Sequence, residues 1–257
     1  MGNSIGSNQD DRPWRNRHSA FSLGMTMSQR VVRMFAQVAE RYDIANTLIT
    51  AGLHRRWRER AVRAGMVRQG MNVLDCATGT GDFALALVRA VGPTGTVTAT
   101  DICEPMLAVF RRKVQHRYPN LRIEYADMLA LPYPDGGFDV TCCGYGIRNA
   151  DDPQRALAEM ARVTKAGGRV VVVETGVPSP RLLRWLYAVH MRVVVPLIGQ
   201  VVVGNRDAYE YLPRTAAVFP CGEQFLQLME ATGAFDTLTA QPLLGGASYI
   251  YVGVRRS

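Results

Sequence analysis

The fold of this chain is decided by residues 73–82, which read Val73-Leu74-Asp75-Cys76-Ala77-Thr78-Gly79-Thr80-Gly81-Asp82. A short apolar run ends in an acid, a turn of small residues follows, and a helical pattern begins at Phe83. Glycine adopts positive φ without steric strain and lets a ligand approach the backbone, and the amide groups at a helix start are free to donate hydrogen bonds. The stretch therefore predicts a strand, a glycine-rich turn and a helix that bind a nucleotide-type cofactor.

Two cofactors fit this turn. The pattern Gly-x-Gly-x-x-Ala over 79–84 matches the fingerprint of dinucleotide-binding folds. The pattern Asp-x-Ala-x-Gly-x-Gly over 75–81 is similar to the acidic turn that holds S-adenosylmethionine (SAM) in class I methyltransferases. Both interpretations require a second acid about 20 residues on, at the end of the next strand, where it binds ribose hydroxyls. Asp101 satisfies either of them.

The sequence beyond Asp101 favours SAM. Asp127 and Met128 follow the strand expected at 121–125, and an acid at that place can accept a hydrogen bond from an adenine amino group. Residues 131–139, Leu-Pro-Tyr-Pro-Asp-Gly-Gly-Phe-Asp, are similar to the loop before the fourth strand of many class I methyltransferases. We therefore expect SAM as the cofactor rather than a dinucleotide.

Strands and helices alternate along the chain. Strands are expected at 71–76, 97–101, 121–125, 138–143, 169–174, 235–240 and 248–254, and helices at about 82–91, 104–117, 152–165 and 222–232. Such alternation predicts an α/β fold with a parallel sheet, and the short link between the last two strands makes one edge strand antiparallel. We expect a Rossmann-like class I methyltransferase fold, with a seven-stranded, mostly parallel sheet, one antiparallel edge strand and helices on both faces.

Length and composition suit one domain with a sizeable core, because the chain has 257 residues and is 47% hydrophobic. We expect that domain at 28–257, with an apolar insertion at 176–213 that forms a lid over the substrate. The five cysteines form no Cys-x-x-Cys pair and are expected as reduced thiols of a cytoplasmic protein. The four histidines are scattered, so no metal site is expected. No signal peptide is expected, because the N-terminus lacks an apolar segment.

The net charge of +8 lies mostly in the first part of the chain, where residues 1–70 hold 12 arginines against five acids. Residues 1–27 are polar, rich in Gly, Ser and Asn, and without periodicity, which predicts a disordered basic arm. A basic arm can meet nucleic acid or an anionic membrane surface. We favour the membrane surface and expect no nucleic-acid partner.

The insertion carries the pattern of a basic amphipathic helix. Apolar residues share one helical face and arginines lie opposite: Leu182, Trp185, Leu186, Val189 and Val193 against Arg181, Arg184 and Arg192. Such a helix can lie at a membrane interface, roof an apolar pocket or pack on the core. Polar and charged residues within 182–204 argue against a clean membrane span.

Segments outside the cofactor turn carry a more specific pattern. They are 38–46 (VAERYDIAN), 52–57 (GLHRRW), 145–149 (YGIRN), 207–212 (DAYEYL) and Phe219-Pro220. Together they resemble the UbiE/MenG family of quinone C-methyltransferases, over roughly residues 30–254. The chain departs from the family at Tyr145, at 175–176 and at 215–218, which all lie near the expected substrate pocket.

The resemblance implies transfer of a methyl group from SAM to a ring carbon of a polyprenylated hydroquinone. Typical acceptors are demethylmenaquinol, which we favour, and the ubiquinol precursor. The matching cofactor positions in this chain are Asp75, Ala77, Gly79, Thr80, Gly81, Asp101, Ile102, Asp127, Met128 and Gly144. The matching active-site positions are Arg148 and Tyr42, with His54 and Asn149 as nearby candidates.

The expected chemistry assigns a role to each candidate. A ring carbon becomes a good nucleophile when a neighbouring hydroxyl loses its proton, so the site must favour a phenolate. Arg148 is a poor base, because a guanidinium keeps its proton, but it can stabilise the phenolate or hold a water that takes the proton. Tyr42 can orient that water or the hydroxyl, and His54 is a candidate base.

Other functions stay open from the sequence. They are methylation of the ubiquinol precursor, methylation of another aromatic small molecule, and a non-catalytic SAM-binding scaffold in a complex of quinone-biosynthesis enzymes. The expected partners are a lipid-tailed quinol and, transiently, a membrane surface, and a homodimer is left open. The expected location is the cytoplasm, peripheral to the inner face of the cell membrane.

Overall fold

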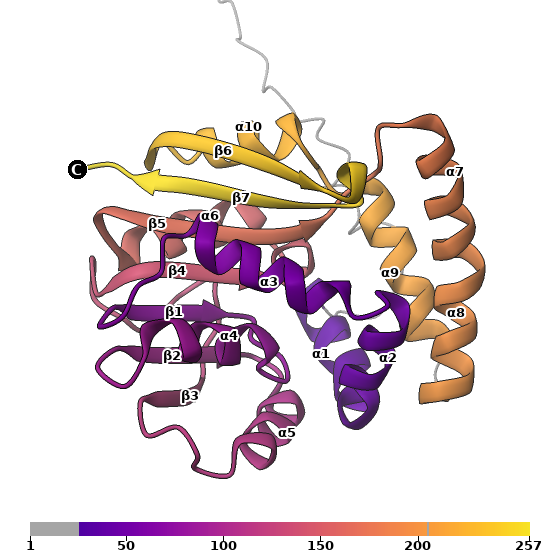
Figure 1. Cartoon of the computed structure of the whole chain (residues 1–257), viewed down its shortest axis with the longest axis horizontal. Coiled ribbons are helices and arrows are strands. Elements are labelled where there is room, and N and C mark those ends of the chain that lie inside the picture. Colours follow the sequence, from indigo (N-terminus) through magenta and orange to yellow (C-terminus); the bar gives the residue numbers. More distant parts are fainter. Residues whose placement is uncertain (1–25, 205) are drawn as a thin grey trace, which may run out of the picture.

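The computed structural model describes residues 26–204 and 206–257. Within these residues, seven strands form one central sheet in the order β3-β2-β1-β4-β5-β7-β6 (Figure 1). The strands are β1 (Asn72–Cys76), β2 (Thr96–Asp101), β3 (Leu121–Tyr125), β4 (Phe138–Gly144), β5 (Thr164–Thr175), β6 (Phe235–Leu243) and β7 (Ser248–Arg255). Each strand overlaps its predicted place, so the alternating apolar pattern located the strands correctly.

The sheet is mixed, as predicted. β7 pairs antiparallel with both β5 and β6, while the other neighbouring strands pair in parallel. The link between β6 and β7 is the short turn η6 (Leu244–Gly246), and a link of that length can join only antiparallel strands. The antiparallel strand lies one place inside the edge, because β6 pairs on its outer side.

Helices cover both faces of the sheet, which confirms the predicted layers. Adjacent residues of a strand point to opposite faces, so Val73 packs into one layer and Leu74 into the other. The first layer contains α3 (Leu53–Ala64), α4 (Asp82–Val91) and α5 (Glu104–Val114), and the second contains α6 (Pro153–Val163) and α10 (Glu223–Glu230). Each large apolar side chain buried between helix and sheet contributes roughly 1.5–3 kcal/mol to stability.

Helix α6 ends two residues before the end of the helix predicted at 152–165. Thr164 already pairs with Phe138 of β4, so the chain leaves the helix earlier than the sequence pattern indicated. The Gly167-Gly168 pair, which follows the predicted helix, lies inside β5, where the register between β4 and β5 shifts. Pairing with the neighbouring strand therefore sets this boundary.

The chain before the sheet forms α1 (Met27–Val38), the short η2 (Ala39–Arg41) and α2 (Tyr42–Ile49). Thr26 caps α1, since its hydroxyl accepts from the Gln29 amide at 3.2 Å and the Gln29 side chain accepts from the Thr26 amide at 3.1 Å. Apart from Thr26 and Met27, the basic arm predicted for 1–27 lies outside the described residues. Helix α1 lies over the carboxyl ends of β2 and β4 (Figure 1).

The insertion forms a helical layer of its own. Its first part is a continuous helical run of α7 (Arg181–Val189), η4 (His190–Val194), α8 (Val195–Ile198) and η5 (Gly199–Val203), and α9 (Arg206–Val218) follows. This run of 23 residues is long and apolar enough, by length and composition, to cross a membrane. Its 18-residue apolar window has a mean hydropathy of 1.7, and 22% of that window is buried. Figure 1 shows α7 and α8 on the outer side of α9, away from the sheet. Met191 and Val195 turn inward and pack with Val38 and Ala45.

Candidate active site

Two cavities open side by side at the carboxyl ends of the strands, where α/β folds bind ligands. The cofactor pocket is formed by the turn after β1, the ends of β2 and β4, and α1, with Thr78, Gly79, Asp101, Asp127, Gly144 and Val31 in its wall. The acceptor cavity has a volume of about 370 Å³ and is formed by α1–α3, α7, η4 and α9, with Met34, Ile49, Trp57, Leu183, Met191 and Tyr209 in its wall. Both cavities are lined by Phe35, Tyr42, Arg58 and Tyr145.

The turn after β1 has a shape that requires glycine. Gly81 caps the start of α4 with φ of 86°, and a Cβ there would lie 2.0 Å from the Phe110 ring. Gly79 has φ of 58°, and nothing lies within 4 Å of the place where its Cβ would stand. A ligand can therefore approach the backbone at Gly79, while Gly81 is needed for close packing of α4 against α5.

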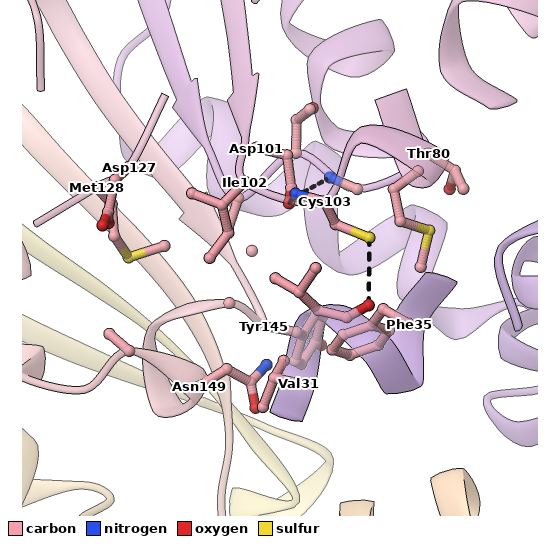
Figure 2. A pocket seen from close by; sticks show the side chains of 18 of the residues that line it. Val31, Phe35, Thr80, Asp101, Ile102, Cys103, Asp127, Met128, Tyr145 and Asn149 are labelled. Atoms are coloured by element: carbon pink, nitrogen blue, oxygen red, sulfur yellow. Dashed lines mark hydrogen bonds between the residues drawn. The ribbon is translucent and has the colours of Figure 1, made fainter. Parts of the chain in front are cut away.

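Asp101 ends β2 and faces the cofactor pocket (Figure 2). Its two carboxylate oxygens accept hydrogen bonds from the amides of Gly79 and Cys103, each at 2.8 Å. Burial raises the pKa of Asp101, and the amide bonds oppose that rise. These bonds fix the carboxylate beside the glycine turn, where an acceptor for ribose hydroxyls is needed.

Asp127 and Met128 lie across the pocket from Thr80 (Figure 2). The Asp127 carboxylate accepts from the Leu129 amide at 2.9 Å, which fixes one of its oxygens. An adenosine-type ligand needs both hydrogen-bond acceptors and donors. The carboxylates of Asp127 and Asp101 supply the acceptors, and the open backbone of the glycine turn supplies the donors. The residues present therefore fit SAM.

Asp75 and Gly81 are the two predicted cofactor residues that the structure does not place in the pocket wall; all the others line it. Asp75 is fully buried at the end of β1, where the Thr78 hydroxyl donates to its Oδ2 at 2.7 Å. Burial raises the pKa of Asp75 to about 7. Asp75 and Gly81 thus shape the turn from behind, while Ala77, Gly79, Thr80, Ile102 and Gly144 face the pocket.

The catalytic candidates gather around the boundary between the two cavities. Tyr42 lines both, Arg148 and His54 line the acceptor cavity, and Asn149 lines the cofactor pocket. Asn149 accepts a hydrogen bond from the Tyr211 hydroxyl at 3.1 Å. The structure thus brings together four residues that are up to about 100 positions apart in the sequence.

Arg148 is buried and paired. Its guanidinium donates to Glu174 Oε1 at 2.6 Å and to the Tyr145 carbonyl at 2.7 Å. Burial would lower the pKa of Arg148, but the Glu174 carboxylate outweighs that effect and the pKa is raised. Arg148 therefore stays charged, and its Nε has no hydrogen-bond partner among the described residues. A guanidinium that stays charged and has N–H groups without a partner among the described residues can serve a substrate oxygen but cannot act as a base.

His54 is buried at the end of a polar network. The Thr50 hydroxyl donates its single proton to the Asn46 carbonyl at 2.7 Å, so His54 Nδ1 is the donor in the 2.6 Å bond to Thr50. His54 Nε2 faces Asp82 Oδ2 at 3.6 Å. His54 Nε2 has no hydrogen-bond partner among the described residues, and the role of His54 as a base stays a prediction.

The network continues to the cofactor turn through residues that the sequence did not single out. Lys113 Nζ bonds Asp82 at 2.5 Å and Asp43 at 2.7 Å, and the Thr80 hydroxyl donates to Asp43. Burial would raise the pKa of Asp82, but its basic neighbours hold it well below the ordinary value. Asp82 and Asp43 belong to the segments 73–82 and 38–46, whereas Lys113 lies on α5. Only the fold brings these three residues together.

The sheet order, the glycine turn and the acid that ends β2 define a SAM-dependent methyltransferase of class I. Solved structures share this fold. A SAM-dependent methyltransferase from Thermotoga maritima aligns with a TM-score of 0.61 at 19% identity, over 88% of this chain and 100% of that one. One from Aquifex aeolicus aligns with a TM-score of 0.57 at 17% identity, over 77% and 89%.

The chain belongs to the ubiE/COQ5 methyltransferase family, whose model matches residues 24–255. A ubiquinone/menaquinone biosynthesis C-methyltransferase UbiE from Bdellovibrio bacteriovorus is 44% identical over 220 residues, which cover 86% of this chain and 93% of the relative. A demethylmenaquinone methyltransferase from Thermus thermophilus is 40% identical, over 86% of this chain and 100% of the relative. One from Halalkalibacterium halodurans is 36% identical, over 90% of this chain and 95% of the relative. The family and the site together make this chain a SAM-dependent methyltransferase.

Proposed function

We propose that this enzyme methylates a ring carbon of a lipid-tailed hydroquinone in menaquinone or ubiquinone biosynthesis, with demethylmenaquinol as its preferred acceptor. The observation that carries the proposal is an apolar cavity that shares four wall residues with the cofactor pocket. Relatives named demethylmenaquinone methyltransferase support the choice of acceptor. An aromatic ring in the acceptor cavity would face the cofactor pocket across Phe35, Tyr42 and Tyr145.

SAM, when bound, supplies the methyl group. The ring carbon forms its bond to that methyl as the methyl–sulfur bond breaks, and the ring then loses the hydrogen at that carbon as a proton. Arg148 stabilises the phenolate oxygen next to the reacting carbon, because its charge is fixed and its guanidinium has N–H groups without a partner among the described residues. Tyr42 lies at the boundary between the cavities and orients that oxygen or a water beside it.

The outer face of the α7–η5 run supports contact with a membrane surface, from the cytoplasmic side. Large apolar side chains on this run are exposed: Leu182 (71%), Trp185 (62%), Leu186 (49%), Val193 (58%), Leu197 (57%) and Val201 (72%). Monomeric soluble proteins rarely expose a contiguous apolar patch of this kind, and Trp favours the membrane interface. Leu186 also lines the acceptor cavity. The cavity therefore opens beside the exposed face, and a lipid tail can pass between them.

The acceptor is tested by methyl transfer from labelled SAM to reduced demethylmenaquinone and to the demethylated ubiquinol precursor, side by side in detergent. We expect product from both with a higher kcat/KM for the naphthoquinol. Higher kcat/KM for the ubiquinol precursor would reverse the preference. No product from either, with SAM binding intact by calorimetry, would refute the proposal.

The membrane contact is tested by flotation with vesicles that contain anionic lipid. Replacement of Leu182 and Trp185 by Ser should reduce the bound fraction several-fold, because two exposed apolar side chains lose their place in the interface. Tyr125→Ser is the matched control, since Tyr125 is 64% exposed but lies on β3, an edge strand of the sheet, and not on the α7–η5 run. Equal binding of all three proteins would argue against this face.

A further inference from the structure

Tyr209 of α9 is a buried residue to which the mechanism above gives no role. It lines the acceptor cavity and is 5% exposed. Among the described residues its hydroxyl has no hydrogen-bond partner. A buried hydroxyl without a partner destabilises the folded state, because the group has lost its hydrogen bonds to water and gained none in return. Native proteins therefore rarely contain one away from a ligand or water site. Since Tyr209 forms part of the cavity wall, a ligand bound in the cavity can supply the missing partner of its hydroxyl.

The ring of Tyr209 is held in place while its hydroxyl stays a donor. The ring packs into a cluster with Val38, Ala45 and Met191, and a Cβ on Gly199 would lie 2.5 Å from Tyr209. This close approach fixes the ring against η5. Burial raises the pKa of Tyr209, and the nearby Tyr42 raises it further. The phenol is thus neutral and offers an O–H donor from a rigid wall.

We propose that Tyr209 donates a hydrogen bond to the second hydroxyl of the hydroquinone, the one away from the carbon that is methylated. This inference rests on the proposed function. A hydroquinone has hydroxyls on opposite sides of its ring, and the one beside the reacting carbon lies near Tyr42 and Arg148, at the boundary of the cavities. Tyr209 lines the acceptor cavity but not the cofactor pocket. Arg148 also lines only the acceptor cavity, but it bonds the carbonyl of Tyr145, which lines both cavities, whereas Tyr209 packs against η5 of the helical insertion. It is thus placed for the oxygen that lies farther from SAM.

The assignment makes Tyr209 a specificity residue. A site built to bond a substrate hydroxyl rejects an analogue that lacks it, because a buried polar group is then left unpaired. The enzyme should therefore prefer a hydroquinone to a phenol that keeps only the hydroxyl beside the reacting carbon. The size of one neutral hydrogen bond predicts a preference of about tenfold or more in kcat/KM.

The test compares two acceptors of short chain length in detergent: a 3-prenyl-1,4-naphthoquinol and the matching 3-prenyl-1-naphthol. In the full-length protein, Tyr209→Phe should raise KM for the quinol about tenfold, with kcat nearly unchanged and KM for the naphthol unchanged. The preference of the wild type for the quinol should disappear. The melting temperature should stay equal or rise, because the change removes an unpaired hydroxyl.

Tyr211→Phe is the matched control. Tyr211 lies on the same helix and lines the same cavity, but its hydroxyl donates to Asn149 at 3.1 Å. This variant should melt at a lower temperature and keep the preference for the quinol. Loss of the preference to the same degree in Tyr211→Phe would overturn the assignment to Tyr209.

Two further outcomes separate the two proposals. Turnover of the quinol by wild type with an unchanged KM in Tyr209→Phe would overturn the role of Tyr209 and leave the proposed function standing. A KM raised equally for both acceptors, together with a lower melting temperature, would mean a purely structural tyrosine and also overturn it. No turnover of either acceptor by wild type would refute the proposed function itself.

Discussion

The cofactor pocket and the acceptor cavity share four wall residues but are built in different ways. The cofactor pocket takes most of its wall from one turn and from the ends of neighbouring strands, with carboxylates at Asp101 and Asp127. The acceptor cavity is formed by helices that precede β1 and by helices inserted between β5 and β6, and its polar groups include Arg148 and His54, while Arg58 lines both cavities. One cavity is thus acidic and formed by the core fold, and the other is apolar, cationic and formed by added helices.

The difference suits the two ligands. A nucleoside offers hydroxyl and amino donors, which carboxylates and carbonyls accept. A phenolate needs a fixed cation in a site from which water is excluded, since electrostatic stabilisation is stronger there. The Asp82–Lys113–Asp43 network joins Thr80 and Asp82 in the wall of the cofactor pocket to His54 in the wall of the acceptor cavity. A substitution in the wall of one cavity should therefore affect mainly the ligand of that cavity. A substitution within the network should affect both SAM and the quinol.

The largest effect is expected from Asp101→Ala, which should weaken SAM binding at least about 100-fold. A carboxylate that binds two ribose hydroxyls loses two charged hydrogen bonds, each contributing about 1.5–3 kcal/mol. Calorimetric titration with SAM measures the change, and circular dichroism checks the fold. SAM affinity within twofold of wild type would show that the cofactor does not use the acid that ends β2.

Arg148→Lys should lower kcat about 100-fold while SAM affinity changes less than twofold. Lysine keeps the charge beside Glu174 but loses the guanidinium fork and the free Nε. Lysine is preferable to alanine, because removing one partner of a buried ion pair destabilises a protein by about 3–5 kcal/mol. Single-turnover kinetics with SAM in excess measure the step. A parallel loss of SAM affinity would mean that Arg148 shapes both cavities.

Asp82→Asn should have an intermediate effect and should affect both cavities. It weakens the contact with Lys113 and leaves His54 Nε2 without its carboxylate. We expect SAM affinity to fall and KM for the quinol to rise, each about threefold to tenfold. Calorimetry and steady-state kinetics on the same preparation test this. An effect confined to one ligand would show that the network does not couple the cavities.

The smallest effect on either cavity is expected from Asp75→Asn, because Asp75 lines neither. Its effect should appear in stability. The pKa of Asp75 is about 7 in the folded protein and near 4 in an unfolded chain, so the folded state binds the extra proton between these values. Its contribution to stability is complete below about pH 4 and is lost as the pH rises through about 7. Asp75→Asn should therefore gain stability relative to wild type by about 1 kcal/mol per pH unit in that window.

Urea denaturation of wild type and Asp75→Asn at pH 5 and at pH 8 measures this difference. Asp82→Asn serves as the control, since the pKa of Asp82 is lowered and its carboxylate is charged in both the folded and the unfolded state at pH 5 and at pH 8, so the stability difference of this variant from wild type should be the same at both pH values. Its carboxylate contributes stability above about pH 4 that is lost as the pH falls. If Asp75→Asn and wild type differ in stability by the same amount at both pH values, that result would mean that burial does not raise the pKa of Asp75.

The two cavities were predictable from the sequence to different degrees. The turn at 75–81, Asp101 and Asp127 could be located because each follows a recognisable strand, and strand ends meet at one edge of a parallel sheet. The wall of α1 over the pocket was missed. The apolar face of α1, with Val31 and Phe35, is visible in the sequence, but its spacing does not say which surface it covers.

The acceptor cavity was less predictable from the sequence than the cofactor pocket. Arg148, Tyr42 and His54 were candidates because their segments resemble a family, and no local pattern indicated that they share a cavity. Glu174 as the partner of Arg148, and the network through Lys113, followed from no motif. The unpaired hydroxyl of Tyr209 was equally invisible, because a missing hydrogen bond depends on every neighbour of the group.

The sequence by itself determined the order of strands and helices, the glycine turn and the acids that follow the strands, because these depend on local periodicity and local backbone conformation. It also determined that residues 181–203 have an apolar face. Only the tertiary structure decided that this face is exposed, that the helices enclose an apolar cavity, and which charges lie in it. Those outcomes depend on packing between segments far apart in the chain, where burial and pairing are set by shape rather than by sequence spacing.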